Sequence, residues 1–132
     1  MPEARSPTPE ATPIRLWLPV LAYMAVIFGL SSISHTPAMP GGSDKVLHTL
    51  LYSGLGLLFA RALSGGRAPA SARVILIAAI FGALYGASDE LHQYFNPPRS
   101  VEVADVMADT IGSALGAAAL YAWGIIRGRD GL

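Results

Sequence analysis

The feature that most constrains this chain of 132 residues is a series of four long stretches almost without charged side chains. Each has about the 17–25 residues that a helix needs to cross the hydrocarbon core of a membrane. The stretches are apolar on all sides, so a soluble amphipathic bundle is a poor alternative. We therefore predict an all-α integral membrane protein, a bundle of four transmembrane helices. The predicted spans are residues 16–34, 46–63, 74–95 and 106–126.

Composition excludes several classes of function. Charged residues make up 14% of the chain, against roughly 25% in a typical soluble domain. Nine basic residues balance nine acidic ones, which argues against nucleic-acid binding. The chain has no cysteine, so disulfides, thiol nucleophiles and zinc–thiolate sites are excluded. We expect membrane lipids as partners, no nucleic acid and no cofactor. The oligomeric state is left open.

The chain ends differ in composition from the predicted membrane domain at 14–128. Residues 1–13 are rich in Pro, Thr, Glu and Ala and show no apolar periodicity, so we expect a disordered tail. Residues 129–132 form a short C-terminal tail. A cleaved signal peptide is the alternative interpretation of residues 1–34. Their apolar part exceeds the usual 7–15 residues and no clear A-x-A cleavage site follows, so we favour a retained first span.

The basic residues predict how the helices are oriented. By the positive-inside rule, the side of the membrane that holds most Lys and Arg is cytoplasmic. Four spans put seven of the nine basic residues on the side of both termini, and most carboxylates near the other side. We therefore expect both termini in the cytoplasm. The seven are Arg5, Arg15, Arg61, Arg67, Arg73, Arg127 and Arg129, and the other two are Lys45 and Arg99.

Three of the predicted spans carry a polar stripe at helical spacing. In each stripe, ionisable groups lie near the outer end, and glycine or another small residue lies deeper. Small residues let helices approach closely, and ionisable groups at this depth mark function by default. We predict that the stripes face one another and form an outward-facing polar cluster. They are Lys45–His48–Tyr52–Gly56–Phe59, Ala78–Gly82–Tyr85–Asp89–His92 and Asp105–Asp109–Gly112–Gly116.

Three segments carry a resemblance to a known family. DKVLHTLLY (residues 44–52), DELHQYF (89–95) and PRSVEVADV (98–106) together resemble the VanZ-like family of small bacterial membrane proteins. The resemblance spans residues 24–118 and implies a multi-pass helical protein of the bacterial cytoplasmic (inner) membrane. The founding member is associated with low-level resistance to teicoplanin, a lipoglycopeptide that binds a cell-wall precursor. The resemblance implies no particular reaction.

Two positions depart from the family pattern. Pro98 replaces the usual glycine and stiffens the turn before Arg99. Asp109 replaces the usual asparagine and adds a potential negative charge to the buried layer. Asp109 is then either protonated or paired with a cation, for which Arg99, Lys45 and the histidines are candidates.

The leading hypothesis is recognition of an anionic envelope lipid, or of a lipid-linked cell-wall intermediate, with a link to teicoplanin tolerance. Arg99 would bind an anionic group of the ligand or pair with a carboxylate of its own loop region. The predicted ligand-binding residues are Asp44, Lys45, His48, Tyr52, Asp89, Glu90, His92, Gln93, Arg99, Asp105 and Asp109.

Three alternatives remain open. An intramembrane enzyme acting on a lipid-linked phosphate or ester would draw its catalytic residues from His48, Asp89, His92 and Asp105, although no nucleophile elbow or phosphatase signature is present. A metal site would use Asp44, His48, Asp89 and His92, but we favour hydrogen bonds between histidines and carboxylates that join the helices. A structural or assembly partner would bind no ligand. We favour binding over catalysis.

Overall fold

The computed structural model describes residues 12–32, 43–69, 71–95 and 102–130. These residues form four helices and no strand, which confirms the predicted all-α fold. All four helices are long and apolar enough to cross a membrane. They are α1 (Pro13–Ser31), α2 (Ser43–Leu63), α3 (Arg73–Tyr94) and α4 (Val103–Asp130).

All four helices begin before the predicted spans, and α1 and α3 also end earlier than predicted, at Ser31 and at Tyr94. α2 and α4 each begin three residues before the predicted span, with Asp44 and Asp105 in their first turns. Carboxylates are favourable there because the N-terminus of a helix carries partial positive charge. α1 begins at Pro13, a residue suited to the first helical turn. Of the predicted tail at residues 1–13, residues 1–11 lie outside the described part of the chain.

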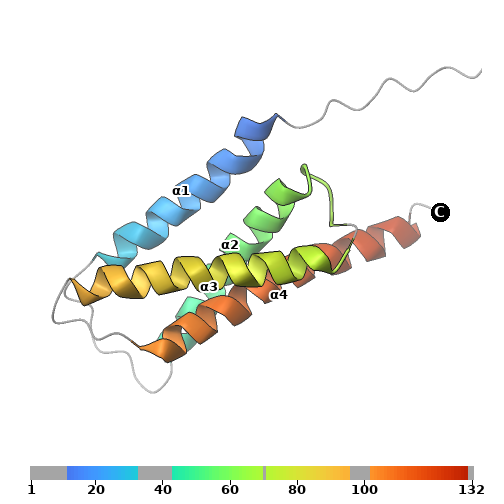
Figure 1. Ribbon diagram of the computed structural model, residues 1–132. Coiled ribbons are helices and arrows are strands. Elements are labelled where there is room, and N and C mark those ends of the chain that lie inside the picture. The colour runs from blue at the N-terminus through green and yellow to red at the C-terminus, as the bar shows by residue number, and fades with distance from the viewer. Residues whose placement is uncertain (1–11, 33–42, 70, 96–101, 131–132) are drawn as a thin grey trace, which may run out of the picture.

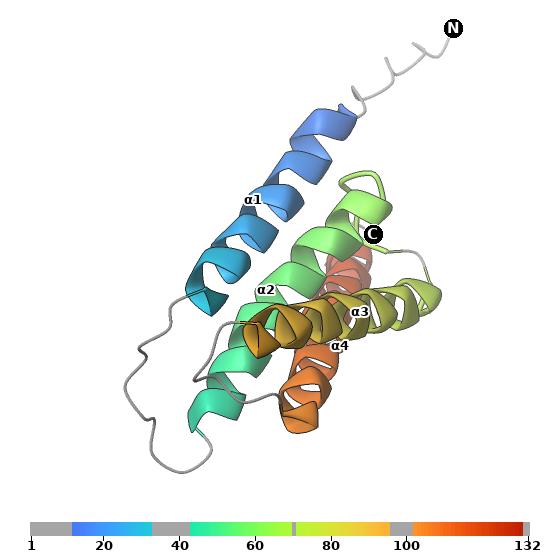
Figure 2. The same cartoon turned by 60° about the vertical axis from the view of Figure 1, so that its left-hand side comes forward.

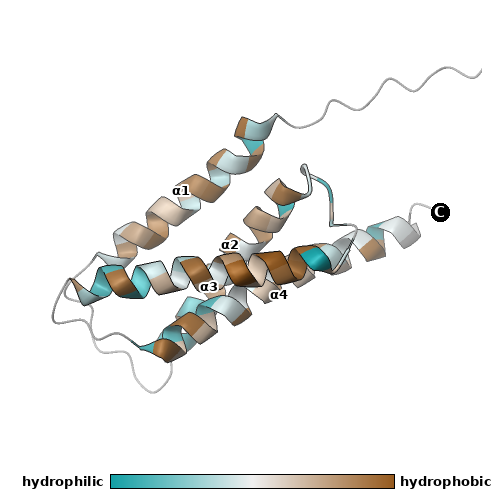
Figure 3. Ribbon diagram, viewed as in Figure 1, coloured by the Kyte–Doolittle hydropathy of each residue, from teal (hydrophilic) through white to brown (hydrophobic). Residues whose placement is uncertain are grey.

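Consecutive helices run antiparallel, and α4 packs mainly against α2 and α3 (Figures 1 and 2). α1 lies at the outside of the bundle and packs mainly against α2. The end of α1, the start of α2, the end of α3 and the start of α4 share one end of the bundle, which we call the polar end. Figure 3 shows hydrophilic turns of α3 and α4 there, and apolar residues along the middle of the helices.

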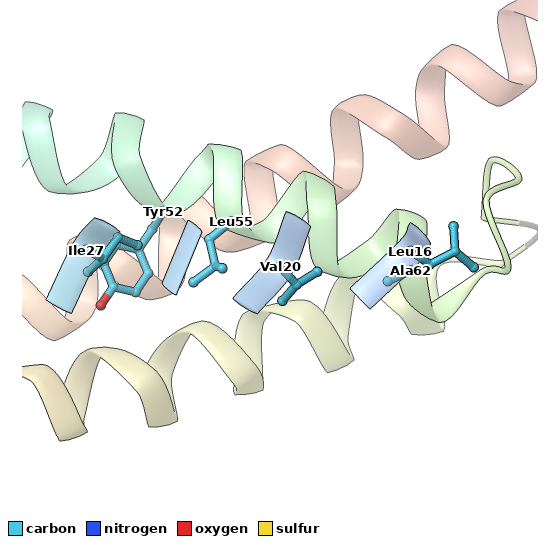
Figure 4. Packing of buried hydrophobic residues seen from close by; sticks show 6 residues of the cluster. All are labelled: Leu16, Val20, Ile27, Tyr52, Leu55 and Ala62. Carbon is cyan, nitrogen blue, oxygen red and sulfur yellow. The ribbon is translucent and has the colours of Figure 1, made fainter. Parts of the chain in front are cut away.

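One buried apolar cluster lies between α1 and α2, and a second joins α2, α3 and α4 at Ala60, Ala78 and Ala117. Leu16, Val20 and Ile27 of α1 pack with Tyr52, Leu55 and Ala62 of α2 (Figure 4). Large apolar side chains on the outer faces of all four helices remain exposed, including Leu18, Leu50, Leu84 and Leu115. Such a surface is unfavourable in water but is matched to the hydrocarbon of a bilayer.

Glycines permit the close approach of α4 to α2 and α3. A Cβ atom added at Gly112 or Gly116 would collide with the backbone of α2, at Thr49 or Ser53. The glycines of the predicted α4 stripe therefore pack closely on α2, as small residues permit between membrane helices. A Cβ atom at Gly56 would likewise collide with the Ser113 backbone, whereas one at Gly82 or Gly86 would meet the side chain of Ser113 or Asp109.

We predict that Gly116→Ala lowers the free energy of unfolding by about 1–3 kcal/mol, because backbone atoms of α2 leave no room for the added methyl group. Thermal unfolding of the purified protein in mild detergent measures the effect. Gly29→Ala on α1 is the matched control, since no atom lies within 4 Å of the added Cβ. An equal loss of stability in both variants would contradict the close packing of α4 on α2.

The orientation of the bundle stays a prediction. If the termini are cytoplasmic, green fluorescent protein fused after residue 132 fluoresces in a bacterial host, and alkaline phosphatase fused there is inactive. Phosphatase inserted after residue 42 or 98, at the polar end, is active. The reverse pattern would place the polar end in the cytoplasm.

Candidate functional site

Lys45 lies at the centre of a group of carboxylates at the polar end. Its Nζ donates hydrogen bonds to Asp44 Oδ2 at 2.9 Å, to Asp105 Oδ1 at 2.5 Å and to Glu102 Oε2. Asp44 and Lys45 belong to the first turn of α2, whereas Glu102 precedes α4 and Asp105 lies in its first turn. Lys45 therefore joins the start of α2 to the start of α4.

His48 forms the second connection between these helices, one turn deeper. Its Nδ1 lies 2.8 Å from Asp109 Oδ1, and its Nε2 lies 3.9 Å from Asp105 Oδ2. Asp109 is completely buried. Of the cations considered as partners for Asp109, the structure places a histidine, His48, against it.

α3 adds two buried carboxylates to this group. Asp89 and Glu90 are 6% and 3% exposed. Glu90 Oε2 accepts a hydrogen bond from the backbone N–H of Glu102 at 2.9 Å, and its carboxyl group lies near that of Asp105. Asp89 is close enough to Asp109 to interact with it electrostatically. Glu90 thus contacts the segment that begins α4, whereas Asp89 points about 100° away from Glu90 on the same helix. We call Asp44, Lys45, His48, Asp89, Glu90, Glu102, Asp105 and Asp109 the polar cluster.

His92 and Gln93 instead connect α3 to α1. The His92 ring stacks on Phe28, and its Nε2 lies 2.9 Å from Ser32 Oγ. Gln93 Nε2 donates a hydrogen bond to Ser31 Oγ at 2.9 Å. The structure therefore does not assemble Asp44, His48, Asp89 and His92 as one metal site. His92 follows Asp89 by three residues, so on a helix its side chain points about 60° away from that of Asp89. This difference is enough for His92 to face another helix.

Four buried oxygen atoms of this region lack a hydrogen-bond partner among the described residues. They are Tyr52 Oη, Glu90 Oε1, Asp109 Oδ2 and Ser113 Oγ. Tyr52 and Ser113 are almost fully buried, whereas the other stripe tyrosine, Tyr85, donates to Met24 O. Buried acceptors and hydroxyl groups without partners are rare and cost about 1–3 kcal/mol each. Their concentration here indicates a place where a ligand, an ion or water completes the hydrogen bonding.

Exposure within the polar cluster decreases from its outer to its deeper residues. Side-chain exposure falls from 48% at Glu102 and 43% at Asp44 to 10% at Asp105 and 0% at Asp109. A polar molecule would therefore enter from the polar end and meet Lys45 before His48.

Sequence reasoning placed two residues of this region outside the candidate set. Glu102 precedes the α4 helix and belongs to no helical stripe. Ser113 could have been predicted from the sequence, because it follows Asp109 by four residues and therefore lies on the same face of α4. Arg99, a predicted ligand-binding residue, lies outside the described residues.

Comparison with protein families shows which family the chain belongs to. The model of the VanZ/LLP1 family matches residues 8–126, nearly the whole chain. The chain belongs to the VanZ/LLP1 family. Searches among curated proteins and among solved structures gave no significant match. Family membership and four apolar helices of spanning length together identify a multi-pass membrane protein.

We predict that Asp109→Ala lowers the free energy of unfolding by about 3 kcal/mol or more, the range for removing one partner of a buried charged pair. Glu102→Ala, at the exposed edge of the same cluster, is the matched control and costs at most about 1 kcal/mol. Reversible unfolding in detergent measures both values. If the pair with His48 carries the effect, His48→Ala combined with Asp109→Ala costs less than the sum of the single changes. Equal losses in the two single variants would show that burial of Asp109 has no energetic role.

Proposed function

We propose that this VanZ/LLP1 protein binds the phosphate-bearing headgroup of an envelope lipid or of a lipid-linked cell-wall intermediate, at the polar cluster. The observation that supports this most directly is the gradient of exposure, from half-exposed Glu102 to fully buried Asp109, among side chains of three membrane-length helices. A cluster that only joined the helices would not need an open side or unpartnered buried acceptors.

The charges of the polar cluster indicate the kind of headgroup. Among its described residues, six carboxylates surround two basic side chains, Lys45 and His48. Lys45, together with Arg99, which precedes Glu102 by three residues in the sequence, would hold the phosphate. The carboxylates and Tyr52 would accept hydrogen bonds from hydroxyl or ammonium groups. A headgroup that combines phosphate with such donors therefore fits better than a bare phosphate.

The positive-inside rule assigns the polar end to the outer leaflet of the bacterial inner membrane, where lipid-linked intermediates would be reached. A role in teicoplanin tolerance is the most specific part of the proposal. Its support is the family resemblance, together with the chemistry of a drug that binds the same class of precursor.

Hydrolysis of a lipid-linked phosphate ester is the second candidate, and the geometry of His48 favours it. The contact between Nδ1 and Asp109 orients the ring and leaves Nε2 to act as a general base. Nε2 would take a proton from water, the water oxygen would bond to phosphorus, the P–O ester bond would break, and the leaving alcohol would receive the proton.

Native mass spectrometry in mild detergent, with phosphatidylglycerol and a lipid-linked cell-wall precursor added separately, tests binding. We expect wild type to keep one discrete lipid mass, and Asp105→Asn and Arg99→Gln to lose it. Asp130→Asn and Arg127→Gln are the matched controls. Their positions lie toward the C-terminal end of α4, about 33–38 Å of helix from Asp105, so both should keep the mass.

The same spectra separate the other hypotheses. A lipid mass converted to a smaller product by wild type, and bound but unconverted by His48→Gln, would favour the enzyme. If wild type carries no specific mass while Asp105→Asn unfolds, the cluster is structural and the binding proposal fails.

A further inference from the structure

The carboxylates around Lys45 are spaced as the ligands of one cation are spaced. One oxygen atom from each of Asp44, Glu102 and Asp105 lies within 4.8 Å of the others. Oxygen ligands of Ca²⁺ lie at about 2.3–2.6 Å from the ion, so two of them are at most about 5 Å apart. Mg²⁺ binds at about 2.0–2.1 Å, demands near-octahedral geometry and gives up its water reluctantly, so a site of this kind suits it less well.

Glu90 provides an independent indication that this group is incomplete. Its side chain is 3% exposed and lies beside Asp105, and its Oε2 already accepts the Glu102 N–H. The other oxygen, Oε1, has no hydrogen-bond partner among the described residues. The Glu90 and Asp105 carboxyl groups are close enough that both cannot carry a charge unless a proton or a cation lies between them, and a bound cation would meet that need.

Lys45 now occupies the position that such a cation would take, since its Nζ contacts all three carboxylates. The ammonium group compensates one negative charge, whereas a divalent cation compensates two. Lys45 also has a flexible four-carbon stem and is 30% exposed, so its end can turn toward the open side of the cluster.

We propose that Asp44, Glu90, Glu102 and Asp105 form a binding site for a divalent cation of the size of Ca²⁺, which exchanges with the Lys45 ammonium group. Competition with Lys45 keeps the affinity low, in the range of about 0.1–1 mM that is typical of extracellular calcium modules. The displaced ammonium group and the ion would then both face a headgroup phosphate, a consequence that rests on the proposed function.

Isothermal titration calorimetry with CaCl₂ and MgCl₂ tests the site. The full chain is used in uncharged detergent, after chelation has removed bound metal and without added lipid. We expect wild type to bind one Ca²⁺ and to bind Mg²⁺ more weakly. Asp105→Asn and Glu90→Gln should each weaken Ca²⁺ binding at least tenfold, and Asp130→Asn should bind as wild type does. If Asp105→Asn does not fold, the half-exposed Glu102→Gln replaces it.

Lys45→Met gives the result that a purely structural ion pair would not produce. Removing the competing ammonium group should strengthen Ca²⁺ binding at least threefold. The proposal is overturned if wild type binds no Ca²⁺ at 10 mM. This holds even if Lys45→Met binds Ca²⁺, because Lys45 is then a permanent counter-ion of the carboxylates in the wild-type protein. Unchanged affinity in both carboxylate variants would also overturn it. No lipid is present, so neither outcome bears on headgroup binding.

Discussion

The pairing of basic side chains of α2 with aspartates of α4 is the interaction on which the rest of the structure depends. In an apolar medium a charge is tolerated only when it is paired or hydrated, so Lys45 must meet Asp105, and Asp109 must meet His48. These two contacts, one helical turn apart, determine the register of α4 along α2. The contacts of Gly112 and Gly116 with the α2 backbone continue the same register deeper in the bundle.

Close packing and the incomplete hydrogen bonding of the site have one cause. Gly82 and Gly86 let α3 approach so closely that Asp109 and Ser113 fill the space beside them. This approach buries Asp109 Oδ2 and Ser113 Oγ without a hydrogen-bond partner among the described residues. The open side, by contrast, lies where Glu102 and Asp44 end the helical packing. Stability therefore comes mainly from the close packing of the deep part, and the proposed ligand would enter at the outer part.

The departure of Asp109 from the family pattern has a physical account in this arrangement. An asparagine at this position can accept a hydrogen bond from His48 but adds no charge. The carboxylate of Asp109 lies 2.8 Å from His48 Nδ1 and so ties the deepest part of the cluster to α2. It also increases the excess of carboxylates, which favours a ligand with cationic or donor groups.

The sequence by itself determined four helices, their approximate limits and the faces that meet, because apolar length and helical periodicity are local properties of the chain. It also predicted Lys45, His48, Asp105 and Asp109 as neighbours. Only the tertiary structure decided that His92 faces α1, that Glu90 binds the backbone of Glu102, and that Ser113 lies against α3. These outcomes depend on which helix covers a given face, and a rotation of about 60° about a helix axis, too small for spacing to resolve, exchanges one neighbour for another.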